Sequence, residues 1–123
     1  MIYVAAPYSD TYRSVVEERF NTTEKIVASM ISAGLPVISP VIHCHEMARN
    51  YNFPIEFEFW KTYCLDILRA SDILYVLMLD GWRESLGVQA EIEFAKKNGI
   101  VVMYFDANGA LISDFYKEII NIQ

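Results

Sequence analysis

The residues with the clearest chemical content lie at positions 80–91, directly after an apolar run at positions 73–79. The apolar run predicts a buried strand, and the pattern from about residue 85 to 98 predicts a helix. Ser85 is a good N-cap for that helix, and Gly87 lets a ligand approach its first turn closely. Because the free N–H groups of a first helical turn bind anions, this turn is a candidate anion site.

Glu91 lies one turn beyond that candidate anion site, on the side of the helix where an acid is least expected. Residues three or four apart share a helix face, which groups Glu91 with Val88 and Ala95 on the apolar side. A carboxylate in this position is either a buried structural acid, paired with a tyrosine or arginine, or a functional group. Burial raises its pKa, whereas a hydrogen-bond donor and the helix N-terminus lower it, so the sequence leaves the net direction open.

The rest of the chain supplies alternating strands and helices that would position these residues. Expected strands cover residues 2–6, 36–39, 73–79 and 100–105; expected helices cover 10–33, 54–69, 85–98 and 111–120; residues 41–53 read as a loop or irregular segment. Near-continuous apolar strands that alternate with helices indicate a parallel sheet covered on both faces. We therefore expect one α/β domain over residues 1–123, with a mostly parallel sheet of four to five strands.

Composition and charge exclude several classes of partner. The net charge of −6 argues against a nucleic-acid polymer or an anionic membrane surface, although a helix N-terminus still binds a small anion locally. No stretch is long enough to cross a membrane, and residues 1–6 lack the basic start of a signal peptide. Two cysteines, Cys44 and Cys64, make no disulfide framework. These features together predict a cytoplasmic protein.

One short segment invites a metal interpretation. His43 and His45 flank Cys44 and are followed by Glu46, but this spacing matches no standard zinc pattern. Only the two histidines would point the same way in an extended segment. We expect no metal and no cofactor.

Three motifs together resemble the nucleoside 2-deoxyribosyltransferase superfamily. They are Ile-Tyr-Val-Ala-Ala-Pro at residues 2–7, Ser71-Asp72 before a strand, and Ser85-x-Gly87-Val88-x-x-Glu91 with a following Ala95. The last motif is the specific one, and the match covers most of the chain in order. It is closest to the compact members, the 2′-deoxynucleoside 5′-monophosphate N-glycosidases. The resemblance implies a flavodoxin-like three-layer sandwich that cleaves or exchanges the N-glycosidic bond of a nucleotide.

The resemblance also implies a role for particular residues. Glu91 occupies the position of the nucleophile that attacks the anomeric carbon, and Tyr3 that of the tyrosine that hydrogen-bonds it. Ser85 matches the serine that holds the 5′-phosphate, although it caps the helix under either interpretation. Ser113 lies in a segment that resembles one supplied by a neighbouring subunit. This implies a homodimer or a higher homo-oligomer, as does the aromatic-rich stretch at residues 51–63.

The edge of the predicted sheet supplies further candidates for contacting substrate, because parallel sheets bind ligands beyond the C-terminal ends of their strands. Tyr8, Ser9 and Arg13 follow the first strand, and Trp82 follows the third. We expect these side chains, with the backbone at Gly87, to contact phosphate, ribose or base. The alternatives are a helix start with a solvated arginine and a tryptophan that covers the sheet edge.

One residue departs from the pattern of the superfamily. Its enzymes commonly carry an aspartate eight residues before the Ser-Asp pair, and here Cys64 stands at that position. Proton donation to the leaving base is therefore in question. The departure favours a second hypothesis, a binding module that sequesters a nucleotide or a nucleotide-derived signal without turning it over.

Overall fold

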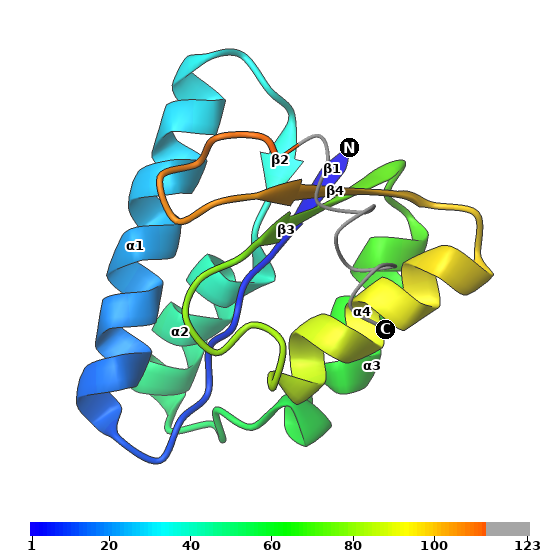
Figure 1. Cartoon of the computed structure of the whole chain (residues 1–123). Coiled ribbons are helices and arrows are strands. Elements are labelled where there is room, and N and C mark those ends of the chain that lie inside the picture. Colours follow the sequence, from blue (N-terminus) through cyan, green and yellow to red (C-terminus); the bar gives the residue numbers. More distant parts are fainter. Residues whose placement is uncertain (113–123) are drawn as a thin grey trace.

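The computed structural model describes residues 1–112 of the chain (Figure 1). In chain order the elements are β1 (Ile2–Ala5), α1 (Arg13–Ser32), β2 (Val37–Ile38), α2 (Pro40–Tyr51), α3 (Phe57–Arg69), β3 (Ile73–Leu77), α4 (Leu86–Lys97) and β4 (Val101–Phe105). None of these helices is long and apolar enough to cross a membrane.

The four strands form one sheet in the order β2-β1-β3-β4, and every neighbouring pair is parallel. Tyr3 of β1 pairs with Ile38 of β2 on one side and with Leu74 of β3 on the other. The chain therefore starts in the middle of the sheet, adds β2 on one side, and then returns to add β3 and β4 on the other. This is the strand order of flavodoxin-like sheets, whose ligands bind at the switch point between β1 and β3.

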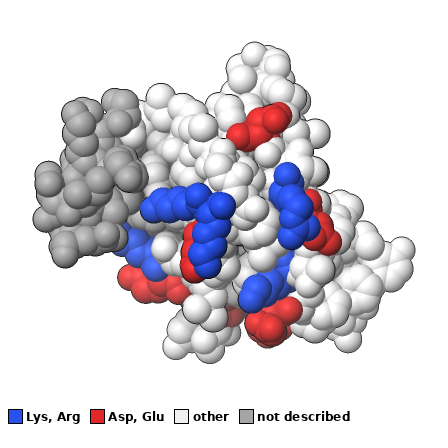
Figure 2. Space-filling model, turned by 90° about the vertical axis from the view of Figure 1, so that its right-hand side faces the viewer, with Lys and Arg blue, Asp and Glu red and all other residues white. Residues whose placement is uncertain are grey.

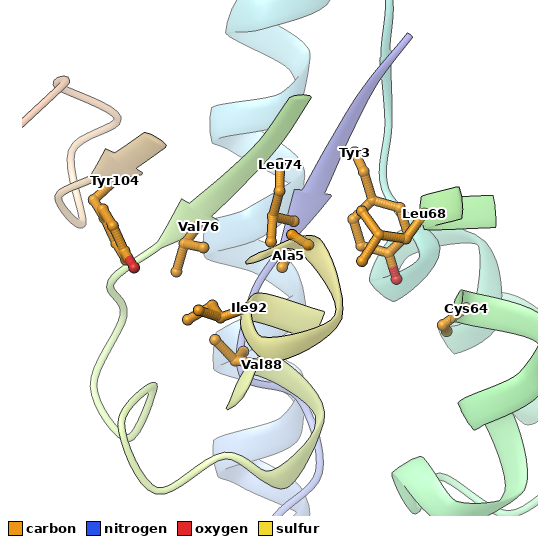
Figure 3. Packing of buried hydrophobic residues seen from close by; sticks show 10 residues of the cluster. Tyr3, Ala5, Cys64, Leu68, Leu74, Val76, Val88, Ile92 and Tyr104 are labelled. Atoms are coloured by element: carbon orange, nitrogen blue, oxygen red, sulfur yellow. The ribbon is translucent and has the colours of Figure 1, made fainter. Parts of the chain in front are cut away.

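Alternation along the strands divides the core into two clusters, one on each face of the sheet. On one face, Tyr3, Leu74 and Val76 meet apolar side chains of α3 and α4, as Figure 3 shows for Leu68 and Ile92. On the opposite face, the neighbouring strand residues meet Ile26, Val27 and Met30 of α1. The two-residue period of a strand and the helical stripes thus produce three layers, α/β/α.

Charged side chains of both signs are interspersed on the side of the molecule that α3 and α4 cover (Figure 2). Two pairs contribute to this arrangement: Arg69 bonds Asp66 at 2.7 Å, and Lys97 bonds Glu93 at 2.9 Å. These exposed pairs follow the three- and four-residue spacing of helix neighbours. Among residues 1–112, this face therefore carries no basic patch of the kind that binds a nucleic-acid backbone.

The prediction of an irregular segment at residues 41–53 was wrong, because helix α2 occupies almost all of it. The expected strand at residues 36–39 stops before Pro40, but proline is also favoured at the first position of a helix, which is where Pro40 lies. Asn52 then ends α2 in a left-handed conformation, with φ of 55°. On this helix His45 is buried and His43 is exposed, so they do not point the same way.

The other boundaries differ by a few residues from the expected ones. Helix α1 begins at Arg13 rather than near residue 10, because the Asp10 carboxylate accepts the Tyr12 N–H at 2.9 Å in a local turn. Helix α3 begins at Phe57 rather than at Pro54, whose carbonyl accepts the Trp60 ring N–H at 2.7 Å. Leu111, expected to start a last helix, forms an antiparallel bridge with Phe105. The rest of that expected helix lies outside the described residues.

Candidate functional site

A pocket opens at the C-terminal end of β1, beside the switch point of the sheet. Its walls come from β1 and the loop after it, the start of α2, the first two turns of α3, and the first turns of α4. Its mouth is open, and the space between its walls, open solvent included, is about 520 Å³. The lining residues are Tyr3, Val4, Ala5, Ala6, Tyr8, Ser9, Pro40, Val41, Cys44, Ile55, Phe57, Trp60, Cys64, Ser85, Gly87 and Glu91.

A buried pair of polar side chains, Tyr3 and Glu91, forms the floor of this pocket. Glu91 is 6% exposed, and the Tyr3 hydroxyl, which is fully buried, donates a hydrogen bond to its Oε2 atom. Figure 3 shows the Tyr3 ring between the sheet and α3, with its hydroxyl directed toward Cys64. The two groups satisfy each other across 88 residues of chain, because β1 and α4 meet at this edge of the sheet.

Burial raises the pKa of Glu91 to about 8, and the hydrogen bond from Tyr3 opposes that rise only in part. The net direction, which the sequence left open, is therefore upward. Burial, followed by the charge of Glu91, raises the pKa of Tyr3 well above 10, so the phenol remains a donor. Burial thus favours the neutral carboxyl, and a positively charged group beside it would favour the ionised form.

The start of α4 lies along the same pocket. Ser85 is the N-cap, as predicted, and its side-chain oxygen accepts the Val88 N–H at 3.2 Å. The serine O–H remains available as a donor toward the pocket. At Gly87 a Cβ atom would lie 3.0 Å from the Phe57 ring, so glycine lets the aromatic wall of α3 approach the first turn. The anion site predicted for this turn is thus bordered by an aromatic ring.

Arg19 fixes the two loops at the mouth, a role that the sequence analysis did not assign. Its guanidinium group donates to the Ser9 carbonyl at 2.8 Å and to the Asp80 carbonyl at 3.2 Å. A Cβ atom at Gly81, whose φ is 89°, would lie 2.3 Å from this guanidinium. The loop after β1 and the loop after β3 are therefore held together beside Ser85.

The structure brings six of the predicted site residues together and separates the others. Tyr3, Tyr8, Ser9, Ser85, Gly87 and Glu91 all line the pocket. Arg13 lines a neighbouring cavity instead, and Trp82 packs against Tyr104 with 6.0 Å between ring centroids, at the edge of the core. The position of Trp82 agrees with the alternative interpretation, in which its side chain covers the sheet edge. Ser113 lies outside the described residues.

Two cysteines that carried no positive role in the sequence analysis form part of the wall. Interaction with Cys44 of α2, followed by burial, raises the pKa of the Cys64 thiol on α3. Both residues are buried, which the helical spacing of Cys64 and Leu68 could have indicated. Among the described pocket-lining residues, Glu91 is the only carboxylate.

A second group was missed because α2 was not predicted. The Tyr8 hydroxyl and His45 Nδ1 lie 2.7 Å apart, and His45 Nε2 lies 3.5 Å from Glu17 Oε1. The His45 ring stacks on Phe20 at 4.0 Å between centroids. The buried positions of α2, Cys44, His45 and Ala48, follow the three- and four-residue spacing of a helix face, the signal that could have found this group.

The sequence model of the family described as "Domain of unknown function (DUF1937)" matches residues 1–107. The chain belongs to this family. The matched region spans β1 to β4 and includes every lining residue of the pocket. No curated protein matches the chain. The family description gives no activity, so the chemistry has to be argued from the site.

Proposed function

We propose that this protein cleaves or exchanges the N-glycosidic bond of a nucleoside or deoxynucleoside 5′-monophosphate, with Glu91 as nucleophile. The observation that carries the proposal is the buried Tyr3–Glu91 pair on the floor of a pocket that the N-terminus of α4 borders. Breaking a glycosidic bond passes through a state with positive charge on the sugar ring, which a carboxylate stabilises or traps covalently. That charge would draw Glu91 into its ionised form, and Tyr3 would hold and orient it.

The first turn of α4 supports the choice of a monophosphate as substrate. Its free N–H groups and the Ser85 hydroxyl can together donate to a phosphate. Six helical residues separate Ser85 from Glu91, a rise of roughly 9 Å that suits the span from a 5′-phosphate to the anomeric carbon. Phe57 and Trp60 give the opposite wall an aromatic surface for a base, and Tyr8 with Ser9 would contact the sugar or phosphate.

The proposal includes assembly into a homodimer or a higher homo-oligomer. A row of aromatic rings runs along α2, α3 and the segment between them, and Tyr51, Phe53, Phe59 and Tyr63 in it are exposed. Trp60 connects the row to the pocket. Exposed apolar patches of this kind favour a protein interface, and a symmetric copy would cover the pocket mouth. Ser113 of that copy would then contribute to the phosphate site.

The proposed location is the cytoplasm, where a small-molecule nucleotide would be the partner. Both cysteines are free and buried, as suits a reducing compartment. Neither a membrane nor a nucleic-acid polymer enters the proposal.

The activity is tested by incubating the protein with a panel of nucleoside and deoxynucleoside monophosphates, followed by chromatography for free base. We expect base release from at least one member of the panel. The panel also identifies the base and the sugar. Absence of release from every member, with no exchange when a second base is added, would contradict the proposal.

Assembly is tested by light scattering at micromolar concentration. We expect a dimer or a higher oligomer, and a mixture of the inactive Glu91→Gln and Ser113→Ala variants should regain partial activity. A fully active monomer would overturn both the interface and the role of Ser113.

A second candidate function is a binding module that sequesters a nucleotide. It is favoured by the pocket itself, because Cys64 stands where a second carboxylate would be expected and Glu91 is the only carboxylate among the described lining residues. Calorimetric binding of a monophosphate without turnover would support this function over the enzymatic one.

A further inference from the structure

The pocket holds a nucleophile, but the source of a proton for the leaving base has to be found elsewhere in its walls. The inference drawn below rests on the proposed function. The N-glycosidic bond breaks faster when a positioned acid gives the departing nitrogen a proton. Apart from Glu91, the polar side chains that line the pocket among the described residues are Tyr3, Tyr8, Ser9, Cys44, Cys64 and Ser85.

Most of these groups are already engaged or are weak acids. The Tyr3 hydroxyl donates to Glu91, and the two cysteines interact with each other, which together with burial raises the pKa of Cys64. Ser85 caps α4 beside the proposed phosphate, and an alkoxide formed at Ser9 would be far less stable than a phenolate. Tyr8 differs from all of them because a buried imidazole lies directly behind it, 2.7 Å away.

That group is His45, which is enclosed between α1 and α2. It is 4% exposed, and its ring is held by stacking on Phe20. The Tyr8 oxygen lies 2.7 Å from Nδ1, and the Glu17 carboxylate lies 3.5 Å from Nε2, which has no hydrogen-bond partner in the described part of the chain. The Glu17 carboxylate thus lies close to Nε2 in the described chain, without forming a hydrogen bond to it. Histidine is the side chain that exchanges protons near neutral pH.

Tyr8 also lies at the boundary between two cavities. It lines the pocket of Glu91 and, with His45 and Glu17, a second cavity on the other side. The charged side chains Asp10, Arg13 and Arg49 line that second cavity as well. Tyr8 therefore connects the substrate pocket to a buried imidazole that the substrate itself does not contact.

We propose that Tyr8 gives the leaving base its proton, and that His45 replaces it through their hydrogen bond. When the bond between the anomeric carbon and the base nitrogen breaks, its electron pair stays on the nitrogen, which takes the Tyr8 proton. Tyr8 regains a proton from His45 Nδ1, so the imidazolium becomes neutral. A Glu91 oxygen forms the new bond to the anomeric carbon. Tyr8 is then a catalytic residue, and His45 and Glu17 are positioning residues that act through it.

The second half of the reaction runs this path in reverse, with water as the acceptor. Water attacks the anomeric carbon, and the electron pair of the carbon–Glu91 bond returns to the carboxylate. The proton released by water passes to Tyr8 while the Tyr8 proton passes to His45, which restores the imidazolium. The same group thus serves as acid and then as base, as in retaining glycosidases.

The test compares two leaving groups in the Tyr8→Phe variant. One substrate is the monophosphate that the wild type cleaves fastest; the other is 4-nitrophenyl 2-deoxyriboside 5′-phosphate, whose phenolate leaves without a proton. In single-turnover experiments we expect Tyr8→Phe to slow base release roughly 10²–10⁴-fold. The first release of nitrophenolate should slow less than about threefold by the same reasoning. His45→Gln should show the same split.

Two matched variants control for the loss of a hydroxyl and of an imidazole. Tyr12→Phe removes the hydroxyl of a tyrosine that is 70% exposed, and His43→Gln removes an exposed imidazole on the same helix as His45. Both should retain both rates. Thermal unfolding shows whether each variant is folded; Tyr8→Phe keeps the ring and decides the question if His45→Gln does not fold.

An equal loss on both substrates would assign Tyr8 a merely structural role, and no loss on the nucleotide would exclude it as the acid. A wild type that cleaves the nitrophenyl substrate but no nucleotide would retain Glu91 as nucleophile and overturn the role of Tyr8. A wild type inactive on both would overturn the proposed function and this inference together.

Discussion

The two faces of the sheet bury polar groups in different ways. On the α1 face one buried polar side chain is Thr23, which is 0% exposed and donates to the Arg19 carbonyl of its own helix at 2.8 Å. On the opposite face, Tyr3 and Glu91 come from distant elements and satisfy each other at the edge of a pocket. A polar group that bonds within its own helix needs no partner from another element of the fold. A carboxyl that depends on a partner 88 residues away constrains both elements.

The difference is also one of charge. A hydroxyl is buried as a neutral group, but a carboxyl can be buried cheaply only while it is protonated. Burial raises the pKa of Glu91 to about 8, so this carboxyl on the pocket face loses its proton less readily than an exposed one. Such a group adds little to stability at neutral pH, and its position beside a pocket is typical of functional sites. Thr23, by contrast, is buried as a neutral group bonded within its own helix.

The largest expected effect comes from replacing the buried polar group on each face in turn. Glu91→Gln should reduce base release by roughly 10³-fold or more, since it removes the proposed nucleophile while keeping its shape. Thr23→Val should leave the rate within about twofold, because its hydroxyl contacts only its own helix. The measurement is turnover of the best monophosphate under saturating conditions.

Glu93→Gln is the matched control on α4 itself, since Glu93 is an exposed acid paired with Lys97. It should retain wild-type turnover. If Glu91→Gln also retained it, the acid on the pocket face would be no more functional than the threonine on the other.

The pH dependence of stability should also distinguish Glu91 from Thr23. The folded-state pKa of Glu91, about 8, is higher than the ordinary value of 4.5. The folded protein therefore holds a proton that the unfolded chain has lost between these values. The contribution of the protonated Glu91 to the free energy of unfolding is fully present below about pH 4.5 and is lost as the pH rises through about 8.

Glu91→Gln removes this dependence. We expect the variant and wild type to have similar Tm values at pH 4, and the variant to be more stable by at least about 5 °C at pH 9. Differential scanning calorimetry across this range measures the gap, and other carboxyls cancel in the difference. A gap that is constant with pH would show that Glu91 ionises as an ordinary surface acid. Thr23→Val, which removes no titratable group, should give such a constant gap.

Some features of the fold and of the pocket could be predicted from the sequence, and others could not. Apolar strands and helix periodicity were enough to predict the three-layer sandwich, because both patterns are local. Glu91 was recognisable because an acid on an apolar helix face breaks a local pattern, and Ser85 because a helix start has a characteristic residue. Each signal lies within a few residues of the feature that it reports.

The Tyr8–His45–Glu17 group carried no such local signal. Its members lie in a loop, in α2 and in α1, and they meet only after α2 folds against α1. Pro40 was compatible with both a strand end and a helix start. Because a loop was predicted after it, His45 was not expected to be buried. Likewise Trp82 occupies an edge position where packing and ligand binding require the same residue type. Which of the two it serves depends on Tyr104, 22 positions away.

The smallest expected effect concerns the anion site, where the comparison is between two helix starts. Ser85 accepts the Val88 N–H at the start of α4, whereas Ser39 at the start of α2 makes no such bond, and its hydroxyl is buried without a partner in the described chain. Ser85→Ala should therefore remove a cap, at about 1 kcal/mol of stability, and also one hydrogen bond to the phosphate. That hydrogen bond contributes on the order of 1.5–3 kcal/mol. The preference of kcat/KM for monophosphates over nucleosides should fall by roughly 10–150-fold.

Ser39→Ala is the control, because it removes an N-cap hydroxyl that neither caps its helix nor lines the pocket. It should change neither stability beyond about 0.5 kcal/mol nor the preference for phosphate. Stability is measured with activity, so that loss of the cap is separated from loss of the phosphate contact. If wild type cleaved nucleosides and monophosphates equally well, Ser85 would be a cap alone. The first turn of α4 would then, like the start of α2, bind no phosphate, and the substrate would be a nucleoside.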